Sequence, residues 1–370
     1  MIKPNSTGVG HFIKGILRGL DHVAAKSGTR VSVLRCPTTS EQLNEFWGSL
    51  HYCECHLVDV DPENHPWADV WLNWQINSWM KFLGGTHLFS PAFIGPLIQG
   101  NYKVVVCLHD TLCWDFPENY PAGFRRYIKT LSWLSARRAW KTVCPSHGAR
   151  EQLLGHQIAR PEIVSYGLDL SLFHPSARGL QNSFLHQMGT KNDPFEIVFL
   201  ASFERRKNHQ ILFEALTISP ACELNLRITL LHHATSEEVH TIQKMAGVHH
   251  VNVEVVTPKS QEAIAEAFRR STFSVLPSLA EGFGAPALES MACGCPVILS
   301  STNWFRLLSG EGERAYLADP YDPKDWAVAI HELLSNPHET ERKRRNAFQF
   351  AQQFTWNSSA AKLLEVCFGR

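Results

Sequence analysis

The sequence of 370 residues has no excess charge of either sign, few cysteines and no long hydrophobic run. Lysine plus arginine and aspartate plus glutamate number 35 each, which argues against a dedicated nucleic-acid binder with its usual basic surplus. Ten cysteines are too few for a disulfide scaffold. The apolar runs are far shorter than the ~20 residues of a membrane span, and no apolar core of signal-peptide length opens the chain. These absences predict a soluble cytoplasmic protein.

What the sequence does contain is an alternation of short β-branched runs with longer amphipathic stretches, which is typical of parallel α/β units. The length favours two domains. The expected strands are residues 30–34, 55–60, 103–108, 162–165, 196–200, 226–231, 251–256, 273–276 and 296–299. The expected helices are residues 10–26, 71–82, 121–141, 208–216, 236–245, 261–271, 286–293, 324–334, 339–354 and 356–368.

Residues 177–194 interrupt this alternation. They carry glycine, serine, asparagine and proline without a sustained period, so we expect a linker there. The pattern then predicts two doubly wound, Rossmann-like domains with a cleft between them. The first would cover 1–176, with 355–370 packing back on it, and the second would cover 195–354.

The most informative stretch follows the expected strand 273–276. A glycine-bearing loop leads to Pro286, which sits where a helix would begin. Backbone amides at such a junction can hold an anion, helped by the helix dipole. Glu281 and Glu289 flank the loop, which suits a ligand with hydroxyls at both ends of a phosphate group, such as a nucleotide sugar. An isolated pair of glutamates at this spacing would be interpreted as solvated loop and helix residues.

Residues 281–289 (EGFGAPALE) and 292–297 (ACGCPV) closely resemble the signature E-G-F-G-x-P-x-L-E and A-x-G-x-P-V of the retaining family 4 glycosyltransferases, which have the GT-B fold. Further resemblances follow the family order over nearly the whole chain. They lie at 8–10, 105–121, 139–154, 165–175, 201–216 and 354–356. The branch with H-D and F-P-E is frequent among bacterial mannosyltransferases of surface polysaccharide biosynthesis.

This resemblance implies roles around a nucleotide-sugar donor. Glu289 would accept hydrogen bonds from the ribose hydroxyls, since a carboxylate can accept two. Glu281 would contact the donor sugar. The loop between them would lie near the diphosphate and the sugar. Its residues are Gly282, Phe283, Gly284, Ala285 and Pro286.

Four further residues receive roles from the same resemblance. Arg206 and Lys207 match the family's phosphate-contacting basic pair, and their charges would stabilise the leaving diphosphate. His109 matches the histidine near the transferred sugar, and Gly10 the amino-terminal glycine loop. His109, Glu281, Arg206 and Lys207 would form the catalytic group.

The implied function is a retaining glycosyltransferase that moves a hexose, first of all mannose from GDP-mannose, to a saccharide or lipid-linked acceptor in surface polysaccharide or lipopolysaccharide assembly. No metal or other cofactor is expected. Asp59-Val60-Asp61 lies in the first half of the chain, away from the glutamate loop, and enzymes of the GT-B fold use basic residues in place of a metal. The run 53–56 (CECH) has no second ligand pair at zinc-site spacing. The alternatives are a catalytically impaired or regulatory nucleotide-sugar-binding protein of the same fold and a sugar-nucleotide epimerase.

Two departures from the family pattern stand out. The family opens with a strand before the glycine loop, whereas only seven residues precede Gly8, so the first strand is expected to be missing. Residues 302–308 (TNWFRLL) lack the usual Pro-Glu pair.

A basic segment suggests where the protein binds its acceptor. Residues 119–150 contain no aspartate or glutamate but several arginines and lysines interleaved with aromatic residues. Such a helix, at 124–141, can lie on the anionic inner face of the cytoplasmic membrane as a peripheral contact. It is also compatible with a domain helix whose apolar side packs on a sheet.

Overall fold

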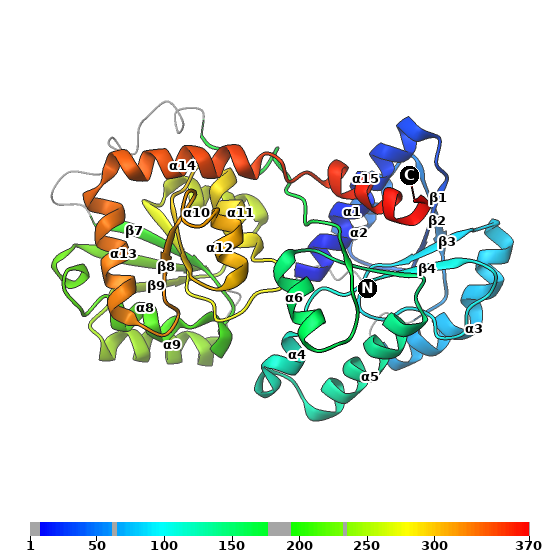
Figure 1. Cartoon of the computed structure of the whole chain (residues 1–370), viewed down its shortest axis with the longest axis horizontal. Helices are drawn as coiled ribbons and strands as arrows, with labels where there is room; N and C mark the ends of the chain where they lie inside the picture. Colours follow the sequence, from blue (N-terminus) through cyan, green and yellow to red (C-terminus); the bar gives the residue numbers. More distant parts are fainter. Residues whose placement is uncertain (1–7, 61–64, 177–193, 232–234, 370) are drawn as a thin grey trace. The chain divides into compact units, whose positions relative to one another are not determined.

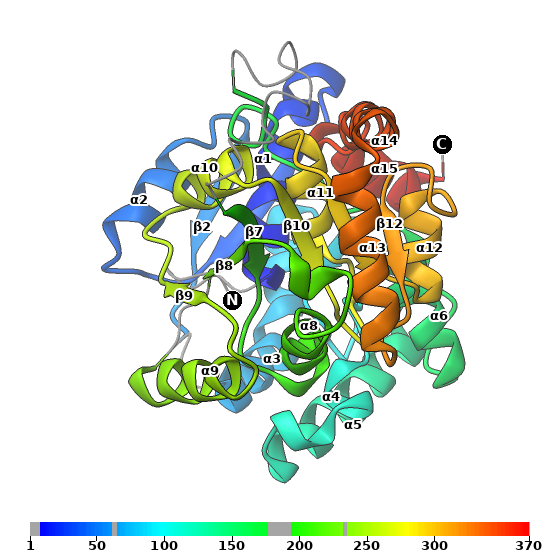
Figure 2. The same cartoon turned by 90° about the vertical axis from the view of Figure 1, so that its left-hand side faces the viewer.

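The computed structural model describes residues 8–60, 65–176, 194–231 and 235–369. The chain divides into two compact units, shown in Figures 1 and 2. Unit 1 is Met1–Leu168 with Phe354–Arg370, and unit 2 is Asp169–Gln353. The boundary therefore lies at Leu168, before the expected position at 176. Apart from Pro194, the expected linker 177–194 lies outside the described residues.

Unit 2 is built on one parallel six-stranded sheet. Its strands are β7 (Phe195–Leu200), β8 (Leu226–Leu231), β9 (Val253–Val256), β10 (Phe273–Leu276), β11 (Val297–Ser300) and β12 (Tyr316–Ala318). The order across the sheet is β12-β11-β10-β7-β8-β9. This is the doubly wound Rossmann order, and it reverses direction between β7 and β10, which is where open α/β sheets bind their ligands.

Helices cover both faces of this sheet, so its strands are apolar on both sides. Phe199, Val275 and Ile298 are fully buried, and Trp326 closes the core from a helix. The helices are α8 (His209–Ala215), α9 (Ser236–Val248), α10 (Gln261–Arg270), α11 (Ala285–Ala292), α12 (Asn303–Ser309), α13 (Pro323–Ser335) and α14 (Pro337–Ala351).

Unit 1 contains two parallel sheets among its described strands. The larger has the order β3-β4-β5-β6, with β3 at His87–Ser90, β4 at Lys103–Cys107, β5 at Lys141–Cys144 and β6 at Glu162–Ile163. The smaller pairs β1 (Val31–Arg35) with β2 (Cys53–Leu57). The expectation of a missing first strand concerns residues before Gly8, which lie outside the described residues.

The helices of unit 1 lie on both sides of its sheets. They are α1 (Gly8–Ser27), α2 (Glu41–Gly48), α3 (His65–Leu83), α4 (Leu112–Asp115), α5 (Ala122–Arg138), α6 (His147–Gly155) and α15 (Trp356–Phe368). In Figures 1 and 2, α3 and α5 lie on the side opposite α1 and α15. The helix expected over 121–141 ends at Arg138, because Lys141 already begins the buried strand β5.

The last helix packs closely along the first. A Cβ atom at Gly15 would lie 2.0 Å from the Trp356 ring, and one at Gly19 would lie 2.1 Å from the Trp356 carbonyl oxygen. Only glycine permits this approach, so Gly15 and Gly19, in the middle of α1, place the carboxy-terminal segment in unit 1.

Candidate functional site

The loops after β7 and β10 meet at the reversal point of the unit 2 sheet. The two strands are neighbours, with Ser274 opposite Val198, so their carboxyl ends reach the same edge. The Leu279 amide donates to the Arg206 carbonyl at 2.8 Å, and the Asn208 side chain donates to the Pro277 carbonyl at 3.2 Å. These backbone contacts hold the basic loop against the glutamate loop.

Glu281 lies at the centre of a buried charge network. Its carboxylate accepts from Lys207 Nζ at 2.6 Å, Arg206 at 3.1 Å and Ser278 Oγ at 2.7 Å, and its side chain is only 8% exposed. Burial opposes its ionisation, but the charges of Lys207 and Arg206 and these hydrogen bonds outweigh that effect and lower the pKa of Glu281 to about 2. It is therefore a carboxylate at neutral pH.

The two cations are balanced by two acids. Arg206 Nε also donates to Glu204 at 2.7 Å, while burial lowers the pKa of Lys207 against the opposing charge of Glu281. The structure thus brings Arg206, Lys207 and Glu281 together, as expected, but as ion-pair partners. Sequence analysis missed Glu204 and Ser278, although the spacing Ser278-x-x-Glu281 is one at which a hydroxyl and a carboxylate can meet.

Glu289 has the opposite environment. It lies in α11, is 8% exposed, and no described side chain forms an ion pair or hydrogen bond with its carboxylate. Burial alone raises its pKa to about 7. Leaving such a group without a partner costs free energy, so its environment fits a ligand that supplies hydrogen-bond donors.

The loop between the glutamates is shaped by helix α12. Trp304 Nε1 donates to the Phe283 carbonyl at 2.6 Å. Gly284 has a left-handed φ of +74°, and a Cβ atom there would lie 2.7 Å from the Phe305 ring. Ala285 and Pro286 then open α11, whose first N–H groups have no acceptor within the helix. Trp304 and Phe305 were not among the predicted site residues, because they stand where the family pattern has a different segment.

The remaining two predicted residues belong to unit 1. His109 follows β4, and its Nε2–H donates to the Pro91 carbonyl at 2.7 Å. Its ring packs against Phe12 at 4.9 Å, and burial lowers its pKa to about 4, so it is neutral at pH 7. Gly10 lies in the first turn of α1 and not in a loop. The glycine-loop expectation is therefore wrong at this position, because the helix begins at Gly8.

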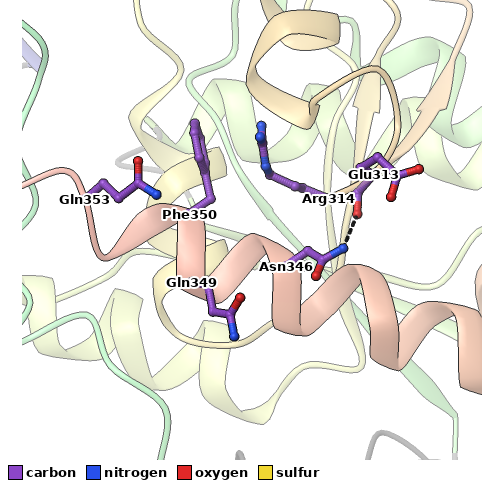
Figure 3. A pocket seen from close by; sticks show the side chains of 6 residues that line it. All are labelled: Glu313, Arg314, Asn346, Gln349, Phe350 and Gln353. Atoms are coloured by element: carbon purple, nitrogen blue, oxygen red, sulfur yellow. Dashed lines mark hydrogen bonds between the residues drawn. The ribbon is translucent and has the colours of Figure 1, made fainter.

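A separate cavity of 280 Å³ on unit 2 contains none of the predicted residues (Figure 3). The Arg314 guanidinium lies 3.9 Å from the centre of the Phe350 ring, and Asn346 donates to the Glu313 carbonyl at 3.3 Å. The polar side chains that line this cavity thus already contact one another. The cavity is therefore not part of the site around Glu281 and Glu289.

Residues 8–60, 65–176, 194–231 and 235–369 contain neither a metal cluster nor a membrane-spanning helix. Among those residues, no three histidine, cysteine, aspartate or glutamate side chains gather as they would around a metal ion. Within the same ranges, no helix is both long and apolar enough to cross a bilayer.

Two family models match the chain in succession. The model described as Glycosyltransferase Family 4 matches residues 7–172, and the model described as Glycosyl transferases group 1 matches 182–350. Curated relatives include the D-inositol 3-phosphate glycosyltransferases of Thermomonospora curvata, 29% identical over 59% of this chain and 53% of the relative, and of Paenarthrobacter aurescens, 29% identical over 61% and 57%. The chain thus spans about half the length of the curated relatives it matches.

Solved structures share the fold across both units. A sucrose-phosphate synthase from Thermosynechococcus elongatus has a TM-score of 0.73 at 17% identity, covering 98% of this chain and 93% of the other. HepE of Anabaena with UDP and glucose has a TM-score of 0.73 at 16% identity, covering 100% and 98%. The architecture is thus GT-B: two Rossmann-like α/β units. The two glycosyltransferase family models together match most of the chain, one after the other along its length.

Proposed function

We propose that the protein is a retaining glycosyltransferase that moves a hexose from a nucleoside-diphosphate sugar to a saccharide or lipid-linked saccharide. The observation that carries this proposal is the buried Glu289 carboxylate, which no described side chain neutralises, beside a loop that ends at a helix N-terminus. A ribose offers two adjacent hydroxyl donors, and a carboxylate accepts two. The same loop would place a diphosphate at the first turn of α11.

The ion-paired residues suit the other end of such a donor. Lys207 and Arg206 fix the orientation of Glu281, so its oxygens are held in place for the hydroxyls of the sugar. The two cations would share their charge between Glu281 and the departing diphosphate as negative charge develops there. His109, being neutral, would contact the sugar through hydrogen bonding and not as a cation.

The environments of the two glutamates support a retaining mechanism. No described carboxylate besides Glu281 and Glu289 is assigned to the donor, and Glu281 is engaged by two cations. We infer front-face attack on the anomeric carbon, in which the acceptor oxygen forms the new bond and the C–O bond to the diphosphate breaks. A donor phosphate oxygen takes the acceptor proton, and no metal takes part.

The identity of donor and acceptor is a narrower proposal. The branch resemblance favours GDP-mannose and surface polysaccharide or lipopolysaccharide acceptors. The fold neighbour HepE was solved with UDP and glucose, and the curated relatives are named for D-inositol 3-phosphate. These names define the panel to test: GDP-mannose and UDP-glucose as donors, and membrane extract and inositol phosphate as acceptors.

We also propose that the protein works in the cytoplasm at the inner face of the membrane. Helix α5 supports this, because it has five basic residues, no acidic residue and exposed aromatic side chains at Phe124 and Trp133. The structure shortens the expected contact from 124–141 to a helix that ends at Arg138.

The test is transfer of radiolabel from each sugar nucleotide to each acceptor, followed by NMR of the product and a repeat with EDTA. We expect one donor to be used, with the anomeric configuration retained and the rate unchanged by EDTA. Glu254→Gln is the control for substitutions of the two site glutamates, because Glu254 is an exposed glutamate on β9 outside the site.

The outcomes separate the alternatives. An inverted product would rule out the front-face mechanism, and strict metal dependence would contradict the role given to the basic pair. UDP or GDP binding without transfer to any acceptor would favour an impaired or regulatory protein. Conversion of the nucleotide sugar to its epimer without an acceptor would favour the epimerase.

A further inference from the structure

Helix α3 of unit 1 carries an exposed aromatic stripe that sequence analysis did not single out. Trp67, Trp74 and Phe82 are 60%, 76% and 76% exposed. At about 3.6 residues per turn, steps of seven and eight residues return to the same face of a helix. The buried residues Ile76 and Met80 occupy the opposite face. The stripe is thus the outer surface of a helix whose inner side packs on the protein.

The stripe is free of acidic residues. Asp69 is the one acidic residue of α3, and its carboxylate accepts a hydrogen bond from the Tyr127 hydroxyl of α5. The one lysine of this helix, Lys81, is exposed beside Phe82. Any charge on the outer side of α3 is therefore positive.

Helix α5 lies beside α3 and adds cations. The two helices are adjacent in both views of Figures 1 and 2, and the Tyr127–Asp69 hydrogen bond joins them. The inner side of α5 is set by Ser135, which exchanges hydrogen bonds with the Gly95 backbone. Its exposed side includes Arg137, whose guanidinium lies 4.4 Å from the centre of the Trp133 ring.

We propose that the outer faces of α3 and α5 form a binding surface for an anionic lipid bilayer. Here the aromatic stripe of α3 enters the interfacial layer and the cations of α5 meet the headgroups. Tryptophan is enriched at membrane–water interfaces, where an apolar body and a polar N–H are both satisfied. Cations beside such a stripe favour an anionic bilayer over an uncharged apolar partner. The surface extends the α5 contact and does not depend on sugar transfer.

The test is co-sedimentation of the full chain with phosphatidylcholine vesicles that contain or lack phosphatidylglycerol. We compare the wild type with Trp74→Ser/Phe82→Ser and with the control Tyr321→Ser, an aromatic residue of unit 2 that is 78% exposed. We expect the double variant to bind anionic vesicles at least about tenfold more weakly than the wild type does. The control should bind as the wild type does. Added salt should weaken the binding of the wild type and of the control to anionic vesicles.

Thermal melts check that the double variant is folded, which is expected because both side chains are exposed. Equal binding of the wild type and the double variant would overturn the proposal, as would no binding by either. A concentration-dependent dimer by light scattering that the double variant abolishes would overturn it too, because the surface would then belong to a second copy of the chain. Transfer to a soluble acceptor is measured in parallel and should be the same for the wild type and the double variant, whatever the vesicle experiment shows.

Discussion

Replacing Glu289 by glutamine should stabilise the protein while weakening donor binding. Burial raises the pKa of Glu289 from 4.5 to about 7, so the folded state binds its proton more tightly than the unfolded state does. Stability therefore falls as the pH rises from 4.5 towards 7, and the full cost is present above pH 7. A shift of this size corresponds to about 3 kcal/mol. Glutamine carries no charge to bury and removes this cost.

The expected gain can be measured by thermal unfolding. About 3 kcal/mol corresponds to roughly 6–12 °C for a unit of this size. We expect Glu289→Gln to raise the melting temperature by that order at pH 8 and to change it far less at pH 4.5, where the folded wild-type carboxyl is protonated and that of the unfolded chain is about half protonated. Glu254→Gln, which alters an exposed glutamate, should change neither value.

Donor binding should respond in the opposite direction. If the ribose needs the carboxylate, the loss of charge-assisted hydrogen bonds should weaken UDP or GDP binding at pH 8 by about 1.5–3 kcal/mol, or roughly 10–150-fold. At pH 6 only about one tenth of wild-type Glu289 is ionised, so the advantage of the wild type should shrink about tenfold. Calorimetry gives the nucleotide affinity of the wild type and of Glu289→Gln at each pH. The ratio of these two affinities cancels the titration of the nucleotide itself. A ratio that is the same at both pH values, with no gain in melting temperature at pH 8, would refute the reasoning.

Three other variants test other parts of the structure. Glu281→Ala strips the shared carboxylate from two buried cations, so it should lower stability by about 3–5 kcal/mol as well as transfer, and an unchanged melt would contradict the network. Trp304→Phe keeps an aromatic ring but loses the hydrogen bond to the Phe283 carbonyl; we expect about 1 kcal/mol weaker nucleotide binding by calorimetry. Arg126→Glu/Arg137→Glu should weaken sedimentation with anionic vesicles at low salt and leave donor hydrolysis unchanged, whereas equal sedimentation would count against α5.

The sequence predicted the repeating parts of the fold well. Strand β8 has its expected bounds, Leu226–Leu231, because a run of β-branched and leucine residues between polar ends leaves little choice. The expected helix at 121–141 ran three residues past the end of α5 and reached the first residue of β5, since Lys141 is compatible with either element and pairing with β4 decides between them. Strand β3 was missed because its four residues begin with histidine and end with serine.

The site shows the same division between local and distant information. The glutamate loop followed from a contiguous motif, and the structure places it at the strand-order reversal. The pairing of Glu281 with Lys207 joins residues 74 positions apart, which no local pattern encodes. The opposite environments of Glu281 and Glu289 also depend on what surrounds each side chain after folding. Resemblance identified the residues, whereas their protonation states required the structure.

A single carboxylate ties the β1–β2 strand pair of unit 1 to helix α1. Asp21 of α1 accepts hydrogen bonds from the backbone N–H groups of His51, Tyr52 and Cys53, at 3.2, 2.7 and 2.7 Å, just where β2 begins. A two-stranded sheet is marginally stable alone, so the β1–β2 pair depends on such ties to α1. Burial opposes the charge of Asp21, but the three backbone bonds prevail and hold its pKa below the ordinary value.

We therefore expect acid to weaken this part of unit 1 as Asp21 takes up its proton. The stabilisation is present above the ordinary pKa of an aspartate and is lost as the pH falls through the lowered pKa of Asp21. When the carboxyl takes up a proton, the three amides lose a charged acceptor and the tie between the strand pair and the helix weakens. In hydrogen exchange, the amides of β1 and β2 would then open together as one cooperative block, while the four-stranded sheet of the same unit stays closed.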